Sequence, residues 1–258
     1  MLKTRIIPTL LWKNFGLVKG ISFDSTRRVG SVMPAIKVYN TRDVDELILL
    51  DIAATEEVRE PDYDAIEEYA AECFIPLTVG GGVKNIEMIK NLLRAGADKV
   101  VINSAAYDDP HLISQAASRF GVQCVVASID ARCNSDGKYE CYSHCGKHPR
   151  SIAPKEWAMK LEDLGAGEII ITSIDKDGTM SGYDLELIRQ VANNVNIPVI
   201  ASGGAGNYED LYKAICEGNA SAVAAASIFH FTEQTPYEAK KYLNKNNIPI
   251  RDSRIRNQ

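Results

Sequence analysis

The sequence contains no apolar run that approaches the roughly 20 residues needed to cross a bilayer. The N-terminus lacks the long apolar stretch and cleavage site of a signal peptide. The net charge is −5, so no excess of positive charge favours a nucleic-acid backbone or an anionic membrane as partner, although a local site for phosphate is compatible with it. We expect a cytoplasmic protein whose six cysteines are thiols or metal ligands, because disulfides are rare there.

Several catalytic motifs are also missing. The chain has no nucleophile elbow, no P-loop, and no dinucleotide-binding glycine fingerprint followed by an acidic ribose ligand. No linker, low-complexity tract or long run of like charge divides it. With 258 residues, 45% of them hydrophobic, the chain suits a single globular domain over residues 1–258.

Apolar, β-rich segments alternate with helical patterns along the whole chain. The eight expected strands cover residues 5–11, 46–52, 75–79, 99–103, 123–130, 168–174, 197–202 and 220–225. The expected helices cover residues 62–73, 85–95, 110–120, 154–164, 185–194, 208–217 and 236–244, with a weaker one at 33–39. Eight strand–helix units in about 250 residues are typical of a (β/α)8 barrel. Because proline removes a ladder donor, we expect Pro8 at a strand start or a bulge.

An internal repeat favours the barrel over its rival, a doubly wound open sheet. The segment 75–87 (IPLTVGGGVKNIE) matches the segment 197–209 (IPVIASGGAGNYE) at an offset of 122 residues. Segment 46–52 matches segment 168–174 at the same offset. An open sheet explains neither the count of strands nor the repeat. We therefore predict two duplicated (βα)4 halves that close into one barrel.

Paired glycine turns follow the third strand of each half and predict two anion sites. Bare backbone N–H groups at such a turn, facing a helix N-terminus, bind oxyanions. The turns are Gly81-Gly82 and Gly203-Gly204, and after the fourth strands come Asn103-Ser104 and Ala226-Ser227. Tight turns without a ligand are the alternative. We favour the phosphate interpretation, which requires a substrate with two phosphates.

Carboxylates gather where the expected strands end. Asp51, Asp130, Asp175 and Asp177 lie at or just past strand C-termini, on the catalytic face of a barrel. Helix capping alone does not need so many, and carboxylates at this face are natural acid–base groups. Asp130 is the foremost candidate.

A second polar group stands at the strand starts, which places it at the opposite end of the barrel. It consists of two acids and two bases: Arg5, Glu46, Lys99 and Glu168. Taken by itself, such a ring indicates a structural salt-bridge network.

The irregular stretch 132–150 carries a turn signal and is expected to form a hairpin on the catalytic face. Five potential metal ligands fall within it: Cys133, Cys141, His144, Cys145 and His148. Zinc takes Cys and His ligands at close spacing, so a structural zinc clip on the Cys133–Cys145 loop is one interpretation. The spacing matches none of the stronger zinc-finger patterns, and free surface thiols are the other interpretation.

Ten segments together form a specific pattern: RIIP (5–8), VKG (18–20), DEL (45–47), TVGGG (78–82), GADKV (96–100), INSAA (102–106), GAGEI (165–169), TSIDKDGT (172–179), SGGAG (202–206) and SIFHF (227–231). In these the sequence resembles the cyclase subunit of imidazole glycerol phosphate synthase over essentially its whole length. The resemblance implies a (β/α)8 barrel that forms a heterodimer with a glutaminase docked beneath it. Ammonia then crosses the barrel and attacks a bisphosphate substrate on the top face, without a cofactor.

The resemblance also implies roles for individual residues. The phosphate contacts correspond to Lys19, Gly82, Asn103, Ser104, Asp177, Gly178, Gly203, Gly204, Ala226 and Ser227. An ammonia gate corresponds to Arg5, Glu46, Lys99 and Glu168, which replaces the structural interpretation of that ring. Asp98 matches a contact with the glutaminase, and Asp130 matches one of two catalytic carboxylates.

The second catalytic carboxylate is missing from this chain. Leu11 stands where the family carries an Asp, and Thr9 where it carries a Cys. Leucine cannot move a proton, and loss of an acid–base group costs about 10²–10⁴-fold in rate. We therefore predict a divergent paralogue that pairs with a glutaminase and conducts ammonia to another acceptor, for amidine formation on a surface-polysaccharide sugar. It would use Asp130 alone or relay ammonia to a separate sugar amidotransferase.

Two alternatives stay open. The first is ordinary histidine biosynthesis, with another carboxylate replacing the missing one: Asp51, Asp175 or Asp177. The second is a non-catalytic barrel that activates its glutaminase.

Overall fold

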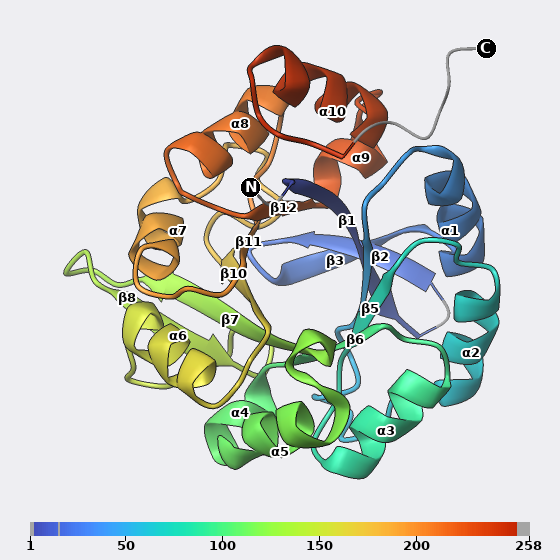
Figure 1. Ribbon diagram of the computed structural model, residues 1–258, viewed down its shortest axis with the longest axis vertical. Helices are drawn as coiled ribbons and strands as arrows, with labels where there is room; N and C mark the ends of the chain where they lie inside the picture. The colour runs from blue at the N-terminus through green and yellow to red at the C-terminus, as the bar shows by residue number, and fades with distance from the viewer. Residues whose placement is uncertain (1–2, 15, 252–258) are drawn as a thin grey trace.

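The structure is a computed structural model that describes residues 3–14 and 16–251, so the ends of the expected domain 1–258 lie outside the described residues. Within this part of the chain, eight parallel strands close into a barrel surrounded by helices (Figure 1). The strands are β1 (Arg5–Lys13), β4 (Leu47–Asp51), β5 (Leu77–Gly80), β6 (Lys99–Ile102), β7 (Val125–Cys133), β10 (Glu168–Ser173), β11 (Val199–Ser202) and β12 (Ala222–Ala225). The pairings of β1 with β12 and of β7 with β10 complete the ring. The predicted (β/α)8 fold is confirmed.

The expected helices are all present in the described residues, the weaker one included. They are α1 (Val32–Thr41), α2 (Tyr63–Ala71), α3 (Ile86–Arg94), α5 (His111–Phe120), α6 (Pro154–Asp163), α7 (Leu185–Ala192), α8 (Tyr208–Cys216) and α10 (Pro236–Lys245). Sequence patterns missed three short helices: α4 (Ser104–Asp108), α9 (Ser227–Phe231) and the 3-10 turn η1 (Val122–Cys124). Each is too short to show a helical period.

The internal repeat has a structural counterpart at the helix starts. Asn85 and Asn207, which are 122 residues apart, are the N-caps of α3 and α8, and each side chain accepts a bond from the third backbone N–H after it. Asp62 and Asp184, at the same spacing, cap α2 and α7 in the same way. Such caps satisfy backbone donors that have no partner within the helix. Both halves therefore begin corresponding helices by the same local device.

Two antiparallel hairpins extend the barrel strands that begin each half. The hairpin after β7 was expected and contains β8 (Tyr139–Ser143) and β9 (His148–Pro149). The hairpin after β1, formed by β2 (Gly16–Ile21) and β3 (Asp24–Gly30), was not expected. In Figure 1, which looks along the barrel, β2 and β3 project onto the middle of the ring.

Side chains alternate along the barrel strands between the outside and the inside of the barrel. The outward side chains pack against the helices and form the main hydrophobic core, and the inward side chains form three layers. In β1 the inward column reads Arg5, Ile7, Thr9 and Leu11, from the bottom of the barrel to its mouth. A smaller apolar cluster fills the middle: Ile7, Ile48, Val101, Val126, Ile170, Ile200, Ala222 and Ala224. Charged groups lie beneath this cluster and polar groups above it.

Pro8 corrects one expectation, because it lies inside β1 and not at a strand start or bulge. Residues 5–8 of β1 pair with β12, whereas residues 9–12 pair with β4. Pro8 therefore lies where the ladder to β4 begins, and its missing N–H removes only a terminal hydrogen bond of that ladder.

None of the helices in the described part of the chain combines the length and the hydropathy that a transmembrane span requires.

Candidate active site

The carboxyl ends of the barrel strands surround a cavity of about 1110 Å³. Its floor includes inward apolar side chains of the middle layer, among them Ile48, Val101 and Ile170. Asp130 and every residue that the resemblance matches to a phosphate contact line it: Lys19, Gly82, Asn103, Ser104, Asp177, Gly178, Gly203, Gly204, Ala226 and Ser227. Residues from both halves of the chain thus meet at the face where barrels carry their active sites.

Both glycine turns have backbone conformations that a side chain would disturb. Gly81 has φ +112°, and a Cβ there would lie 2.2 Å from the Asp51 carbonyl oxygen. Gly204 has φ +111°, and a Cβ there would lie 2.2 Å from the Gly182 carbonyl oxygen. Only glycine lets the backbone pass so close to its neighbours in this conformation. These residues are required by the turns themselves, which bring backbone to the cavity wall.

Buried hydroxyl groups face the cavity without partners in the described protein. Thr9 Oγ1 and Ser227 Oγ are buried atoms with no hydrogen-bond partner, and so is Asn103 Oδ1. All three residues line the cavity. Because most buried polar atoms in proteins are bonded, these atoms indicate where a polar ligand would bind.

Asp130 is a buried carboxylate at the centre of this site. Burial raises the pKa of Asp130 to about 7, and the negative charge of Asp177 contributes to the rise, whereas a hydrogen bond from Asn103 opposes it. The bond joins Asn103 Nδ2 to Asp130 Oδ2 at 2.8 Å. A carboxyl group that titrates near neutral pH can both accept and donate a proton under physiological conditions.

Lys19 and Asp177 form an ion pair that links the first hairpin to the loop after β10. The Lys19 ammonium is almost fully buried and lies 2.7 Å from a carboxylate oxygen of Asp177. The Ser22 N–H donates to the Asp177 carbonyl oxygen at 2.8 Å. Gly178 packs so tightly on Gly20 that a Cβ at Gly178 would lie 2.1 Å from the Gly20 carbonyl oxygen. The Lys19 charge is therefore already compensated by Asp177.

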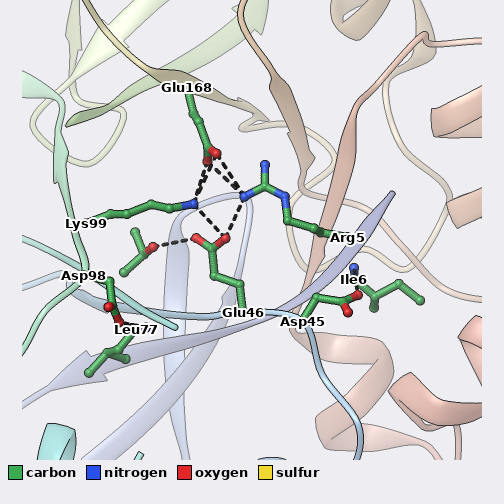
Figure 2. A network of polar contacts seen from close by, with 9 residues as sticks. Arg5, Ile6, Asp45, Glu46, Leu77, Asp98, Lys99 and Glu168 are labelled. Atoms are coloured by element: carbon green, nitrogen blue, oxygen red, sulfur yellow. Dashed lines mark hydrogen bonds and ion pairs between the residues drawn. The ribbon is translucent and has the colours of Figure 1, made fainter. Parts of the chain in front are cut away.

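A closed ring of charges lies at the opposite end of the barrel (Figure 2). Arg5 is 2.7 Å from Glu46 and 3.0 Å from Glu168, and Lys99 is 2.8 Å and 3.1 Å from the same two carboxylates. Thr78 Oγ1 donates to the remaining Glu46 oxygen at 2.6 Å. Burial by itself would lower the pKa of Arg5, but attraction by Glu168 and Glu46 outweighs it and the pKa is raised. Sequence reasoning placed these residues together correctly.

The family model for histidine biosynthesis proteins matches residues 5–235. The chain belongs to this family. Its curated relatives include two proteins called imidazole glycerol phosphate synthase subunit HisF, from Dehalococcoides mccartyi strains BAV1 and CBDB1. Each is 50% identical over 251 residues, which cover 97% of this chain and 99% of the relative. The resemblance to this subunit is confirmed. The predicted polysaccharide role has no support in these comparisons, which fit the histidine-biosynthesis alternative better.

In this member of the HisF family, Leu11 lines the cavity in the inward column of Thr9. The structure separates the carboxylates that were considered as replacements for the missing acid. Asp51 is held by Arg59 at 2.7 Å and by the backbone N–H groups of residues 53 and 54, and it does not line the cavity. Asp175 pairs with Arg132 and does not line it either. Of these three carboxylates, only Asp177 lies in the cavity wall.

Two acidic residues beside the charged ring accept hydrogen bonds from backbone N–H groups near strand starts (Figure 2). The exposed residue Asp98 accepts a hydrogen bond from the Leu77 N–H at 2.8 Å. Asp45 accepts one from the Ile6 N–H at 2.9 Å and pairs with the buried Lys240 ammonium at 2.7 Å. The pair of Asp45 with Lys240 was not predicted, because 195 residues separate its members.

The hairpin after β7 does not bring its three cysteines and two histidines together. Cys141 is fully buried, Cys133 is exposed, and the Cys145 thiol donates to the Ile52 carbonyl oxygen at 3.3 Å. Within the described residues, no group of three or more His, Cys, Asp or Glu side chains is placed to hold a metal ion. Only His144 and His148 come together, with ring centroids 4.5 Å apart.

Proposed function

We propose that this protein is the ammonia-using subunit of a glutamine-dependent synthase of the type its relatives are named for, imidazole glycerol phosphate synthase. One observation carries the proposal: a single barrel holds a cavity with two glycine turns around Asp130 at one end and a closed ring of charges at the other. Entry of ammonia from a separate subunit at the bottom explains the ring of charges, and binding of an anionic substrate at the top explains the cavity with its glycine turns.

The substrate is a small molecule with two phosphate groups. Its phosphates would bind at the turns Gly81-Gly82 and Gly203-Gly204, which follow the corresponding strands β5 and β11 of the two halves. The unpartnered Ser227 hydroxyl favours an oxyanion at the second turn, since it has a hydrogen to donate. The reacting part of the substrate would then lie between the phosphates, beside Asp130.

Ammonia would reach that point as the neutral molecule. The middle layer of the barrel is apolar, and a charged ammonium ion would lose its hydration there at high cost. Ion pairs between Arg5, Lys99 and the two glutamates close the bottom, so part of the ring must move for each passage. At the top, the ammonia nitrogen would bond to an electrophilic double-bonded carbon of the substrate while the π electron pair of that double bond moves to the neighbouring atom, and Asp130 would accept the proton that the nitrogen releases.

The partner is a glutaminase docked at the end that carries the ring, in a heterodimer. Two large hydrophobic residues are exposed on the loops that enter barrel strands at this end. Phe74, before β5, is 76% exposed, and Val122, before β7, is 52% exposed. Exposed apolar side chains next to a polar rim are typical of protein interfaces. Asp98 lies one residue before Lys99 on the same face.

Leu11 favours a second candidate function, in which the same barrel delivers ammonia to another acceptor. Leucine supplies no proton where the HisF pattern noted above has a carboxylate. In this case the product would be an amidine on a sugar, formed with Asp130 alone or by a separate amidotransferase that receives the ammonia.

Complementation of a histidine auxotroph that lacks its cyclase subunit separates the two candidates, provided a glutaminase subunit is expressed with the barrel. Growth with the natural sequence supports the first. If growth requires Leu11→Asp, with Leu11→Asn as the matched control that fails, the natural barrel serves another acceptor. Glutamine hydrolysis by the purified pair, measured in parallel, shows whether the partner is engaged in either case.

A further inference from the structure

The turn between β8 and β9 brings two imidazole rings to the rim of the cavity. His144, Cys145 and Gly146 all have left-handed backbone conformations, with φ of 52°, 56° and 77°. The chain therefore reverses sharply and places His144 beside His148, with ring centroids 4.5 Å apart and ring planes inclined by 32°. Both residues line the cavity.

Three contacts fix this turn against the first half of the barrel. The His144 N–H donates to Ser104 Oγ at 3.0 Å, and Ser104 belongs to the proposed first phosphate site. The Lys147 ammonium lies 2.6 Å from a Glu56 carboxylate oxygen, and the Cys145 thiol is bound to the loop after β4. The backbone of the turn that carries the two imidazoles is thus bonded directly to a residue of the first phosphate site.

The hydrogen bonds around His144 favour one tautomer of its ring. Arg150 Nε donates to Ser143 Oγ at 2.6 Å, so the serine accepts there. The hydroxyl hydrogen of the fully buried Ser143 then has His144 Nδ1 as its acceptor, 3.0 Å away. With Nδ1 accepting, the neutral ring carries its proton on Nε2. Burial lowers the pKa of His144, and the positive charges of His148 and Arg150 act in the same direction. The ring is therefore a neutral donor at physiological pH.

Two carboxylates near the rings already have cationic partners. Glu56 is compensated by Lys147, and Asp108 is compensated by Arg150 at 3.1 Å. Lys84 follows the first glycine turn, lines the same part of the cavity and raises the local potential at His144. Donors without a paired negative charge suit an anion, and phosphate oxygens accept from imidazole N–H and ammonium groups alike.

We propose that His144 and His148, together with Lys84, form a phosphate-binding subsite at the rim that takes one phosphate monoester of the substrate beside the first glycine turn. The inference rests on the proposed bisphosphate substrate but not on the ammonia chemistry. It explains why a hairpin without a metal cluster in the described residues carries two adjacent imidazoles. The neutral His144 and the adjacent His148 contribute directed imidazole contacts, and Lys84 contributes charge.

Histidine ring signals in an NMR titration test this subsite directly on the full-length chain. The probes are inorganic phosphate and glycerol 3-phosphate. We expect both to shift the ring signals of His144 and His148 in a saturable way, whereas the signals of His111, on the start of α5, stay fixed. His144→Ala should weaken binding of glycerol 3-phosphate at this subsite about tenfold, as loss of a charge-assisted hydrogen bond does. His148→Lys should preserve it, and His111→Ala is the matched control.

Several outcomes would overturn the subsite. They are unmoved His144 and His148 signals at saturating glycerol 3-phosphate, a response to inorganic phosphate only, or a response to zinc but to neither phosphate probe. In the synthase assay, His144→Ala should raise KM for the bisphosphate while kcat stays within about twofold. If the phosphate titration succeeds but the synthase assay shows no turnover with any variant, the proposed function fails and the subsite stands.

Discussion

Replacement of Asp130 by asparagine should stabilise the fold while it abolishes the proposed chemistry. The pKa of Asp130 is raised by burial from 3.8 to about 7. At about 1.4 kcal/mol per pKa unit, this difference corresponds to roughly 4 kcal/mol of unfavourable free energy when the carboxylate is ionised in the folded state. Asparagine has nearly the same shape and no charge, so the variant avoids this cost.

The sign of the pH dependence follows from proton binding. Between pH 4 and pH 7 the folded state holds the Asp130 proton and the unfolded state releases it, so this group lowers stability as pH rises. Above pH 7 the full cost is present. Asp130→Asn should therefore exceed the natural protein in stability by about 1–4 kcal/mol at pH 8, and the advantage should shrink by about 2 kcal/mol at pH 5.5.

Urea unfolding of both proteins at the two pH values measures this difference. The control is Asp175→Ser, which removes the charge of an exposed carboxylate that is paired with Arg132 and lies outside the cavity. An Asp130→Asn protein that is no more stable than the natural one at pH 8, or an advantage that does not change with pH, would refute the assignment of a strongly perturbed carboxyl group.

Three further predictions address the rest of the site. Leu11→Asp should raise the rate of the proposed ammonia-dependent synthase reaction by about 10²-fold if a second proton-transfer group limits it. Steady-state assays with ammonium salts measure this rate, and an unchanged rate would show that Leu11 does not limit it. Gly204→Ala should lower the free energy of unfolding by more than about 2 kcal/mol, because the new Cβ would meet the Gly182 carbonyl oxygen. The control Gly137→Ala, at φ +76° in open space, should lower it by about 1 kcal/mol. Equal losses in the two variants would contradict the close approach at Gly204. Lys99→Met should destabilise the fold by about 3 kcal/mol, because it leaves Glu46 and Glu168 with one cation. An unchanged midpoint of thermal unfolding would show that the ring contributes little to stability.

The barrel was predictable because its information is local and repeated. Alternation of apolar strands with helical patterns gives eight units, and the spacing of 122 residues between the glycine turns shows that two halves are copies. The charged ring was predictable for the same reason: each member stands at or directly before a strand start, and strand starts of a barrel meet at one end. Sequence analysis did not give the hairpin β2–β3, whose residues 24–30 (DSTRRVG) lack apolar alternation.

The parts of the site that escaped prediction depend on loop backbone geometry that has no periodic pattern in the sequence. Nothing near Asp51 in sequence indicates that Arg59 and two backbone N–H groups occupy it, yet these bonds remove it from the cavity. The cysteine–histidine spacing suggested a zinc clip, but the hairpin buries Cys141 and leaves Cys133 exposed beside the turn between β7 and β8. The adjacency of His144 and His148 needs three consecutive left-handed residues, of which only Gly146 is signalled by composition.

The central claim is that ammonia crosses the barrel from the ring to Asp130 without mixing with solvent. Glutamine labelled with ¹⁵N in its side-chain amide, supplied to the barrel–glutaminase complex with the bisphosphate substrate and excess unlabelled ammonium, tests it in one measurement. We expect the product to keep most of the label in the natural complex and to lose it with Lys99→Met. Label diluted to the composition of the bulk ammonium pool in the natural complex would show that ammonia does not travel through the barrel.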